Sequence, residues 1–319
     1  MHSDTFNNND RAENTSLLYC RVINVGGCSW EGASRFVKIH GCYFRNCGSI
    51  AIGNVRGRSD YLNTLGTGQH IITDNYFEND NCYGAAMIQI ASAASQVIVS
   101  NNNFTNFNAN AIWLIGECGP VDTPCENLIV RGNIIDMTAA VAASKPRFAV
   151  KITAHFAAVS DNQIYVRGQR DEKFKGIIIS DDAARISVHD NTIAGAGVGI
   201  QSENAVGKVG LVSGETTFFA MTGPAVKPML LRRLSDLYRG WHLVWDDGSE
   251  SEIEYFDPVS TEFKLTQPKT LTEGDSFRIY HPSGVPWSIH HNIIDNCAVS
   301  LALDTCTGRR AYNDSNLIS

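Results

Sequence analysis

The chain has 319 residues, of which 43% are hydrophobic and 18% charged, and its formal net charge is −7. This composition is typical of a globular protein and excludes a disordered one. The acidic balance argues against general attraction to nucleic acid or to anionic membranes, and no apolar run approaches the roughly 20 residues that cross a bilayer. We therefore expect neither nucleic acid nor a membrane as a partner. The polar N-terminus lacks the apolar region of a secretory signal.

A short phrase recurs along the chain: a β-branched run, then an asparagine, any residue and an apolar residue. The asparagines of this phrase are Asn75, Asn102, Asn133, Asn162, Asn191 and Asn292. The first five lie 27, 31, 29 and 29 residues apart, and Cys20 and Cys42 occupy the same slot in two earlier copies. A period in this range predicts a solenoid, in which each repeat buries its apolar face against its neighbours.

Each repeat contains two or three short strands separated by turns. In one copy, residues 97–100 form a predicted strand, Asn102 a bend, Phe104 the start of a second strand and residues 111–115 a third. Asparagine suits the bend because it tolerates the left-handed backbone and its amide can bond to turn groups or to an identical amide in the next repeat. The repeat length fits three strands per turn of a parallel β-helix, which gives an all-β fold.

This pattern resembles the right-handed parallel β-helix proteins of the pectate-lyase-like superfamily, over roughly residues 15–205 and 285–310. The superfamily includes polysaccharide lyases, polygalacturonase-type hydrolases and the tailspike depolymerases of bacteriophages. The resemblance implies a single-stranded β-helix that acts on a polysaccharide in a virion or extracellular setting. It also implies a homotrimer, or a partner chain that caps the open ends of the solenoid. From the sequence itself we expect no cofactor.

One interval breaks the period, because Asn191 and Asn292 are 101 residues apart where one coil needs about thirty. The surplus alternates apolar and polar residues between Asp-Gly and Glu-Gly turns, which is typical of antiparallel hairpins. We expect β-helix coils in 1–206, an inserted β-rich module in 207–284, and a final coil with a polar tail in 285–319. The aromatic residues of the module, Trp241, Trp245, Tyr255 and Phe256, favour core packing over a sugar-stacking platform.

In the family that the chain resembles, the strand after the variable loop often forms the floor of a substrate groove. Alternation along these strands predicts inward pairs such as Ile88 with Ile90 and Ile177 with Ile179, aligned with Val198 and Ile200 on the next strand. Three outward rows follow: Gln89, Trp113 and Lys151; then Thr153, Ser180, Gln201 and Asp304; then Glu117, His155, Asp182 and Glu203.

The third row is the candidate catalytic site, because coils about 4.8 Å apart would bring its carboxylates near the separations of about 5 Å or about 6.5–9.5 Å that glycosidases use. Asp181 adds a further carboxylate to this set. A lyase would instead need a cation beside the uronate and a base, for which Lys151 with Arg147, Arg167 or Arg170 are candidates. Trp113, Gln89, Gln201 and Arg147 are the expected substrate-binding residues.

The sequence thus predicts a polysaccharide-degrading β-helix enzyme, either a glycoside hydrolase or a polysaccharide lyase. The alternative is a β-helix without catalytic activity that binds glycans or serves as a structural tail component, since a solvated polar edge also carries Asp, Glu and His. No Cys or His cluster has the spacing of a metal site, so we expect no metal.

Overall fold

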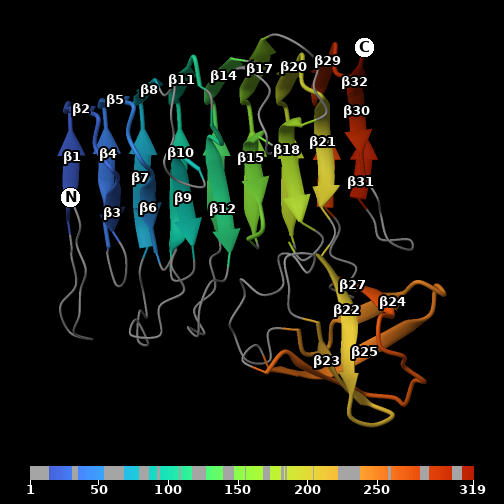
Figure 1. Cartoon of the computed structure of the whole chain (residues 1–319). Coiled ribbons are helices and arrows are strands. Elements are labelled where there is room, and N and C mark those ends of the chain that lie inside the picture. Colours follow the sequence, from blue (N-terminus) through green and yellow to red (C-terminus); the bar gives the residue numbers. More distant parts are fainter. Residues whose placement is uncertain are drawn as a thin grey trace.

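A computed structural model of the chain shows a parallel β-helix that carries a small antiparallel barrel (Figure 1). The structure describes residues 14–30, 35–53, 68–78, 86–91, 94–107, 109–116, 127–138, 147–154, 156–167, 173–180, 183, 185–203, 205–221, 238–257, 260–280, 287–303 and 311–319. Within these ranges every regular element is a strand. The all-β fold predicted from the repeats is confirmed.

Three long parallel sheets form the walls of the β-helix, and each coil adds one strand to each sheet. The first sheet contains, in order, β1 (Ser16–Leu18), β4 (Lys38–His40), β7 (Gly68–Thr73), β10 (Ser95–Ser100), β13 (Leu128–Arg131), β16 (Ala157–Ser160), β19 (Ile186–His189), β28 (Trp287–His290) and β31 (Ala311–Asp314). The second contains β2 (Arg21–Ile23), β5 (Tyr43–Arg45), β8 (Tyr76–Glu78), β11 (Asn103–Thr105), β14 (Ile134–Thr138), β17 (Gln163–Arg167), β20 (Thr192–Ala194), β29 (Ile293–Asp295) and β32 (Leu317–Ile318). The third contains β3 (Cys28–Trp30), β6 (Ile50–Ile52), β9 (Ile88–Ala91), β12 (Ile112–Gly116), β15 (Arg147–Ile152), β18 (Phe174–Ser180), β21 (Val198–Glu203) and β30 (Val299–Ala302).

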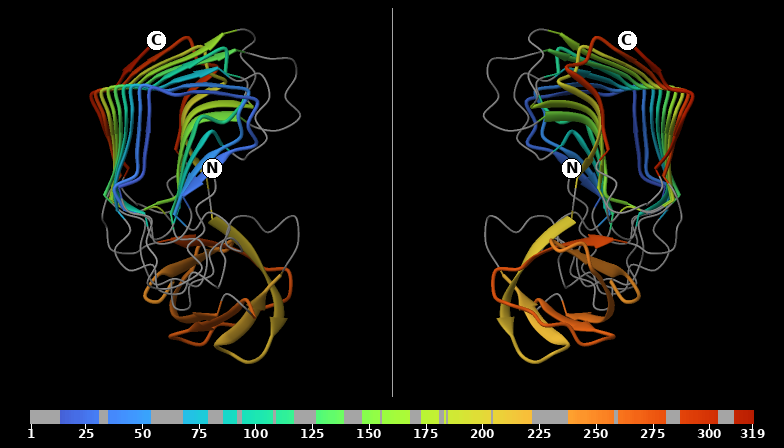
Figure 2. Two further views of the ribbon diagram at one scale, coloured as in Figure 1. Left: turned by 90° about the vertical axis from the view of Figure 1, so that its left-hand side faces the viewer. Right: turned by 90° about the vertical axis from the view of Figure 1, so that its right-hand side faces the viewer.

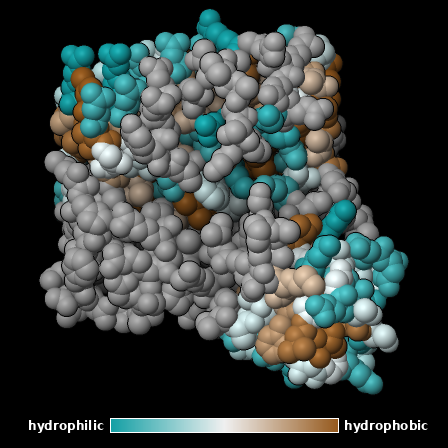
Figure 3. Space-filling model, in the orientation of Figure 1, coloured by the Kyte–Doolittle hydropathy of each residue, from teal (hydrophilic) through white to brown (hydrophobic). Residues whose placement is uncertain are grey.

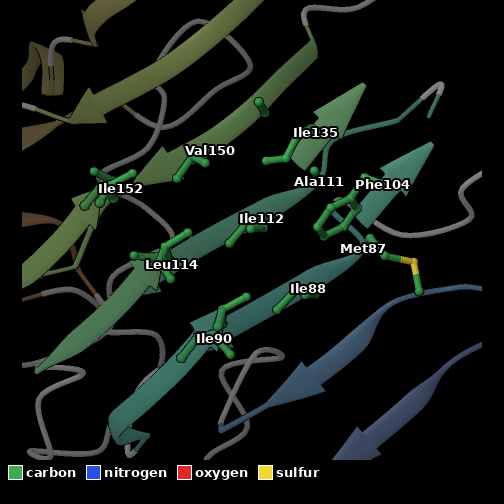
Figure 4. Close-up of a cluster of buried hydrophobic side chains, with 14 of the residues drawn as sticks. Met87, Ile88, Ile90, Phe104, Ala111, Ile112, Leu114, Ile135, Val150 and Ile152 are labelled. Carbon is green, nitrogen blue, oxygen red and sulfur yellow. The ribbon is translucent and has the colours of Figure 1, made fainter. Parts of the chain in front are cut away.

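Seen along the axis, the three sheets enclose a central space (Figure 2). The buried apolar side chains of the three sheets form one core cluster. Residues that face inward stack on their equivalents one coil away, as Ile88, Ile112 and Val150 do on the third sheet (Figure 4). On the second sheet the rings of Phe44, Phe77 and Phe104 are stacked with centroids 5.0 and 4.7 Å apart. Burial of these side chains away from water is the main stabilising contribution to the fold.

The repeated asparagines form a continuous ladder of buried amides. The Nδ2 of each one donates to the Oδ1 of the next at 2.9 Å, from Asn75 through Asn102, Asn133, Asn162, Asn191 and Asn292 to Asn316. Each Oδ1 also accepts the backbone N–H of the preceding ladder residue, and Cys42 N–H donates to the Oδ1 of Asn75 in the same way. The ladder satisfies backbone groups at a buried bend, where an unpaired N–H would be costly.

Two expectations about the ladder need correction. The left-handed residue at the bend is the one before the asparagine, as at Asp74 and Asp161 with φ of 58° and 57°, so the asparagine itself supplies only the amide. The C-terminal tail was expected to be polar and outside the repeats. It contains β31 and β32, and Asn316 between them is the last member of the ladder.

The inserted module is a closed antiparallel barrel that lies below the later coils in Figure 1. Its strands follow the order β22 (Ala205–Val212), β23 (Thr217–Ala220), β26 (Glu262–Leu265), β25 (Glu250–Asp257), β24 (His242–Trp245) and β27 (Ser276–Tyr280). Trp241, Trp245 and Phe256 are buried in its core, which confirms the packing role of these three aromatic residues. Strands β22 and β27 pair with each other, so the barrel begins and ends at neighbouring points.

Candidate functional site

The outward-facing residues of the third sheet form one row across five coils. Gln89, Trp113, Lys151, Ile178 and Gln201 lie opposite one another on β9, β12, β15, β18 and β21. We call this set the outer row. With coils about 4.8 Å apart, it extends for about 19 Å. Figure 3 shows patches of hydrophilic and hydrophobic residues across the middle of the molecule.

Trp113 is the aromatic centre of the outer row. It is half-buried, and its ring packs edge-on against Phe148 with centroids 6.2 Å apart. Buried apolar residues contact it on both sides, Ala86 and Ile178 in one cluster and Ala91 and Ile115 in another. These contacts fix the position of the indole, and they make it part of an apolar floor that lies on the outside of the sheet.

Lys151 and Glu203 form an ion pair across the neighbouring strand β18. Lys151 Nζ also lies 5.3 Å from the centroid of the Trp113 ring, within the range of a cation–π contact. The Lys151 side chain is 12% exposed and that of Glu203 is 39% exposed. The pair therefore brings a largely desolvated ammonium and an accessible carboxylate to one point beside the aromatic ring.

Several polar atoms on these strands are buried and have no hydrogen-bond partner among the described residues. They are Trp113 Nε1, Arg147 Nε, Ser180 Oγ and Gln201 Oε1. Gln89 differs, because its Nε2 donates to Ser49 Oγ at 2.6 Å and to the carbonyl of Ala86 at 3.1 Å. A buried polar group without a partner is costly, so each of these groups needs a partner that the described residues do not supply.

The structure corrects the predicted register of β21. Ser180 lies opposite Glu203, and Ile178 lies opposite Gln201, so both β21 residues are displaced by two positions from the rows in which they were expected. The alignment follows close packing of glycines. A Cβ on Gly176 would lie 2.4 Å from the carbonyl oxygen of Gly199, so Gly176 matches Gly199 and not the earlier Gly197. Glu203 therefore lies in the row of Ser180.

The other predicted catalytic residues Glu117, His155, Asp181 and Asp182 lie outside the described residues, as does Asp304. Thr153, expected to face outward, is buried, and its Oγ1 donates to the carbonyl of Leu114 at 2.9 Å. Of the predicted set, the structure places Gln89, Trp113, Lys151 and Gln201 in the outer row, and Glu203 pairs with Lys151 beside it. Arg147 begins β15, four residues before Lys151. Sequence reasoning did not name Ile178, although the inward assignment of Ile177 and Ile179 already implied that it faces outward.

Two histidine features lie away from the outer row. His70 lies on the first sheet and faces the interior of the β-helix, and burial lowers its pKa to about 4. His189 and His290 stack with ring centroids 5.1 Å apart, and a hydrogen bond from His189 lowers the pKa of Asp190. No group of three or more His, Cys, Asp or Glu side chains within the described ranges is arranged to hold a metal ion. The described ranges also contain no helix long and apolar enough to span a membrane.

Fold and site together define a parallel β-helix protein with a closed antiparallel barrel between two coils and an aromatic, partly charged row on its third sheet. Comparisons of the chain with protein-family models, with curated proteins and with solved structures find no match.

Proposed function

We propose that the chain binds an extended polysaccharide along the outer row, as a β-helix protein of the pectate-lyase-like kind in a virion or extracellular setting. The observation that carries the proposal is the position of Trp113 in one row with the amides of Gln89 and Gln201. An aromatic face stacks on the apolar face of a pyranose ring, and flanking amides bond to its hydroxyl groups.

The length and polarity of the row also fit a polysaccharide. A row of about 19 Å holds several sugar residues side by side with the coils. The buried atoms Trp113 Nε1 and Gln201 Oε1 have no partner among the described residues, and sugar hydroxyls both accept and donate hydrogen bonds. The partly charged floor excludes a purely apolar ligand, because the Lys151–Glu203 pair would then be desolvated without new partners.

Affinity electrophoresis against a panel of neutral and acidic polysaccharides tests this proposal. We expect at least one polysaccharide to retard the protein, and Trp113→Ala to weaken the retardation at least about tenfold by removing the stacking surface. Tyr19→Ala is the matched control, since Tyr19 is 76% exposed on the first coil and distant from the outer row. Retardation by no member of the panel, or equal retardation of Trp113→Ala and the native protein, would overturn the proposal.

Cleavage of the bound chain by β-elimination is the second candidate function, and the adjacent ammonium and carboxylate of Lys151 and Glu203 favour it. Lys151 would balance the charge of the uronate carboxylate while Glu203 removes the C5 proton. The C4–O bond then breaks, a C4–C5 double bond forms, and the leaving oxygen takes a proton from water. Glu203 returns its proton to the hydroxide that remains, which restores the carboxylate. Hydrolysis needs two suitably spaced carboxylates, and Glu203 is the single carboxylate among the described residues of these strands' outer face.

The product distinguishes these activities. Elimination yields an unsaturated sugar with new ultraviolet absorbance, whereas hydrolysis yields reducing ends without it. We expect uronate-containing polysaccharides to give the absorbance, and Glu203→Gln to abolish it while binding persists. New reducing ends alone would indicate a hydrolase, and neither signal with retained binding would leave glycan binding as the function.

A further inference from the structure

A hollow lies on a different wall of the β-helix from the outer row, at the ends of strands β17, β20 and β29, which are adjacent at the top of Figure 1. Its volume is about 400 Å³, within the range of small-molecule sites. Tyr165, Val166, Arg167, Ala194, Gly195 and Asp295 line it. None of these residues belongs to the outer row of the third sheet.

The hollow exists because two neighbouring positions on the middle coil carry almost no side chain. Tyr165 lies opposite Ala194, and Ala194 lies opposite Asp295, so a methyl group separates two larger side chains that are two coils apart. Gly195 extends the floor, and a Cβ there would lie 2.4 Å from the carbonyl oxygen of Val166. The two walls are therefore about 9.6 Å apart, and Ala194 and Gly195 lie between them.

The walls of the hollow have complementary chemistry. Tyr165 is half-buried, and its hydroxyl donates to Gln163 Oε1 at 3.2 Å. The aromatic ring of Tyr165 therefore forms one wall of the hollow. Opposite it, Asp295 is exposed, and its Oδ1 accepts a hydrogen bond from Ser319 Oγ at 2.6 Å. Asn296 completes this side.

The charges at the hollow argue against an acidic ligand. The Arg167 guanidinium binds Asp136 through two contacts, Nε to Oδ1 at 3.0 Å and Nη2 to Oδ2 at 2.9 Å. The charges of Arg167 and Asp136 cancel each other, so the carboxylate of Asp295 gives the hollow a net negative charge. A carboxylate accepts hydrogen bonds from hydroxyl groups and repels anions.

We propose that this hollow binds one neutral pyranose residue, with its apolar face on the Tyr165 ring and its hydroxyl groups donating to Asp295. The site is independent of the proposed polysaccharide row on the third sheet. It gives the molecule a second carbohydrate contact, which recognises a single sugar unit where the outer row recognises a chain.

Saturation-transfer NMR with methyl glycosides of glucose, galactose, mannose and N-acetylglucosamine tests the proposal, with methyl glucuronide as the acidic probe. We expect saturation of at least one neutral glycoside and at least fivefold weaker saturation of the glucuronide. Ala194→Leu fills the hollow without removing a polar group, so it should abolish the signal. Thr192→Leu is the control, because it adds bulk on the same strand and the same face but outside the hollow.

The outcomes separate this site from the outer row. Trp113→Ala should leave the glycoside signal unchanged, and Tyr165→Ala and Asp295→Asn should each weaken it severalfold. Circular dichroism melting of each variant verifies that it is folded. The absence of saturation for every neutral glycoside, or equal saturation of Ala194→Leu and the native protein, would overturn the proposal. Loss of the signal in Trp113→Ala would assign it to the outer row instead.

Discussion

The amide Nδ2 of Asn191 donates to Oδ1 of Asn292 at 2.9 Å, although 101 residues separate the two along the chain. The same contact joins ladder neighbours only 27 to 31 residues apart. The barrel between Asn191 and Asn292 therefore leaves the stacking of the coils uninterrupted. Strand pairing agrees, because β19 pairs with β28 and β20 with β29 as neighbouring coils do elsewhere.

Replacement of Asn133 by alanine should be strongly destabilising. Its Oδ1 accepts both the backbone N–H of Asn102 at 3.0 Å and the Nδ2 of Asn102 at 2.9 Å, and both donors are buried. Loss of the acceptor leaves them unsatisfied, so we expect a loss of about 3 kcal/mol. Thermal melting and hydrogen exchange of the Asn102 amide measure it. Asn316→Ala also removes the acceptor of two donors, those of Asn292, but at this half-buried end of the ladder water can replace it, so the loss should be less than about 1 kcal/mol. Equal effects would contradict the argument from burial.

Stability should fall between pH 6.5 and pH 4 because of His70. Burial lowers its pKa from 6.5 to about 4 in the folded chain. The unfolded chain therefore takes up the proton first as the pH falls, and the contribution of neutral His70 is complete above pH 6.5 and lost by about pH 4. The shift corresponds to about 3 kcal/mol. His70→Leu removes this titration, so urea unfolding at pH 7 and pH 4 should differ less in the variant. His70→Leu also removes the hydrogen bond from Val37 N–H to Nδ1 of His70. This bond is lost at both pH values, so it does not affect the difference between them in the variant.

The two partners of the Lys151–Glu203 pair should respond unequally to substitution. The Lys151 side chain is 12% exposed, so Glu203→Ala leaves a largely buried ammonium without its carboxylate and should cost about 2 kcal/mol. Lys151→Met keeps an apolar stem on Trp113 and leaves a carboxylate that water reaches, so it should cost no more than about 1 kcal/mol. Chemical denaturation of both variants measures the difference. A larger loss for Lys151→Met would show that the lysine contributes chiefly through packing.

Gly195→Ala should destabilise the chain more than Gly248→Ala. Both glycines have positive φ, 74° and 79°, so an alanine at either position is strained by about 1 kcal/mol. A Cβ at Gly195 would also lie 2.4 Å from the Val166 carbonyl oxygen, whereas nothing lies within 4 Å of one at Gly248. We expect a further loss of about 2 kcal/mol at Gly195 from this clash. Melting temperatures of the two variants test the comparison. Equal shifts would show that the backbone around Gly195 and Val166 moves apart to accommodate the methyl group.

The sequence predicts the scaffold well because the ladder requires one residue type at one position of each coil. Asn75 to Asn292 all take their expected places, and the inward alternation that predicts Ile88 with Ile90 is confirmed. Asn316 carried the same signal, since a strand precedes it and an apolar pair follows it. Its short distance from Asn292 concealed it, because the last coil has only 24 residues between ladder positions.

The site is predicted less well because it depends on register and not on periodicity alone. The sequence around Gly197 and Gly199 permits two alignments with Gly176, and both keep the same residues inward. Only the close approach of Gly176 to the Gly199 carbonyl distinguishes them. Trp113 and Lys151 lie where a regular stretch of sheet guides the alignment, so their row was predicted correctly. Glu203 lies beyond the ambiguous stretch, and its row was wrong.

The pairing of β22 with β27 means that the barrel begins and ends one strand spacing apart. Strands within a sheet and coils within a β-helix share that spacing, about 4.8 Å. A closed barrel whose first and last strands are neighbours can thus be inserted between two consecutive coils without distorting the barrel or the β-helix. Every step between coils has this same spacing. A barrel of this kind could therefore be inserted at another coil, or exchanged for another domain, without changing the register of the β-helix.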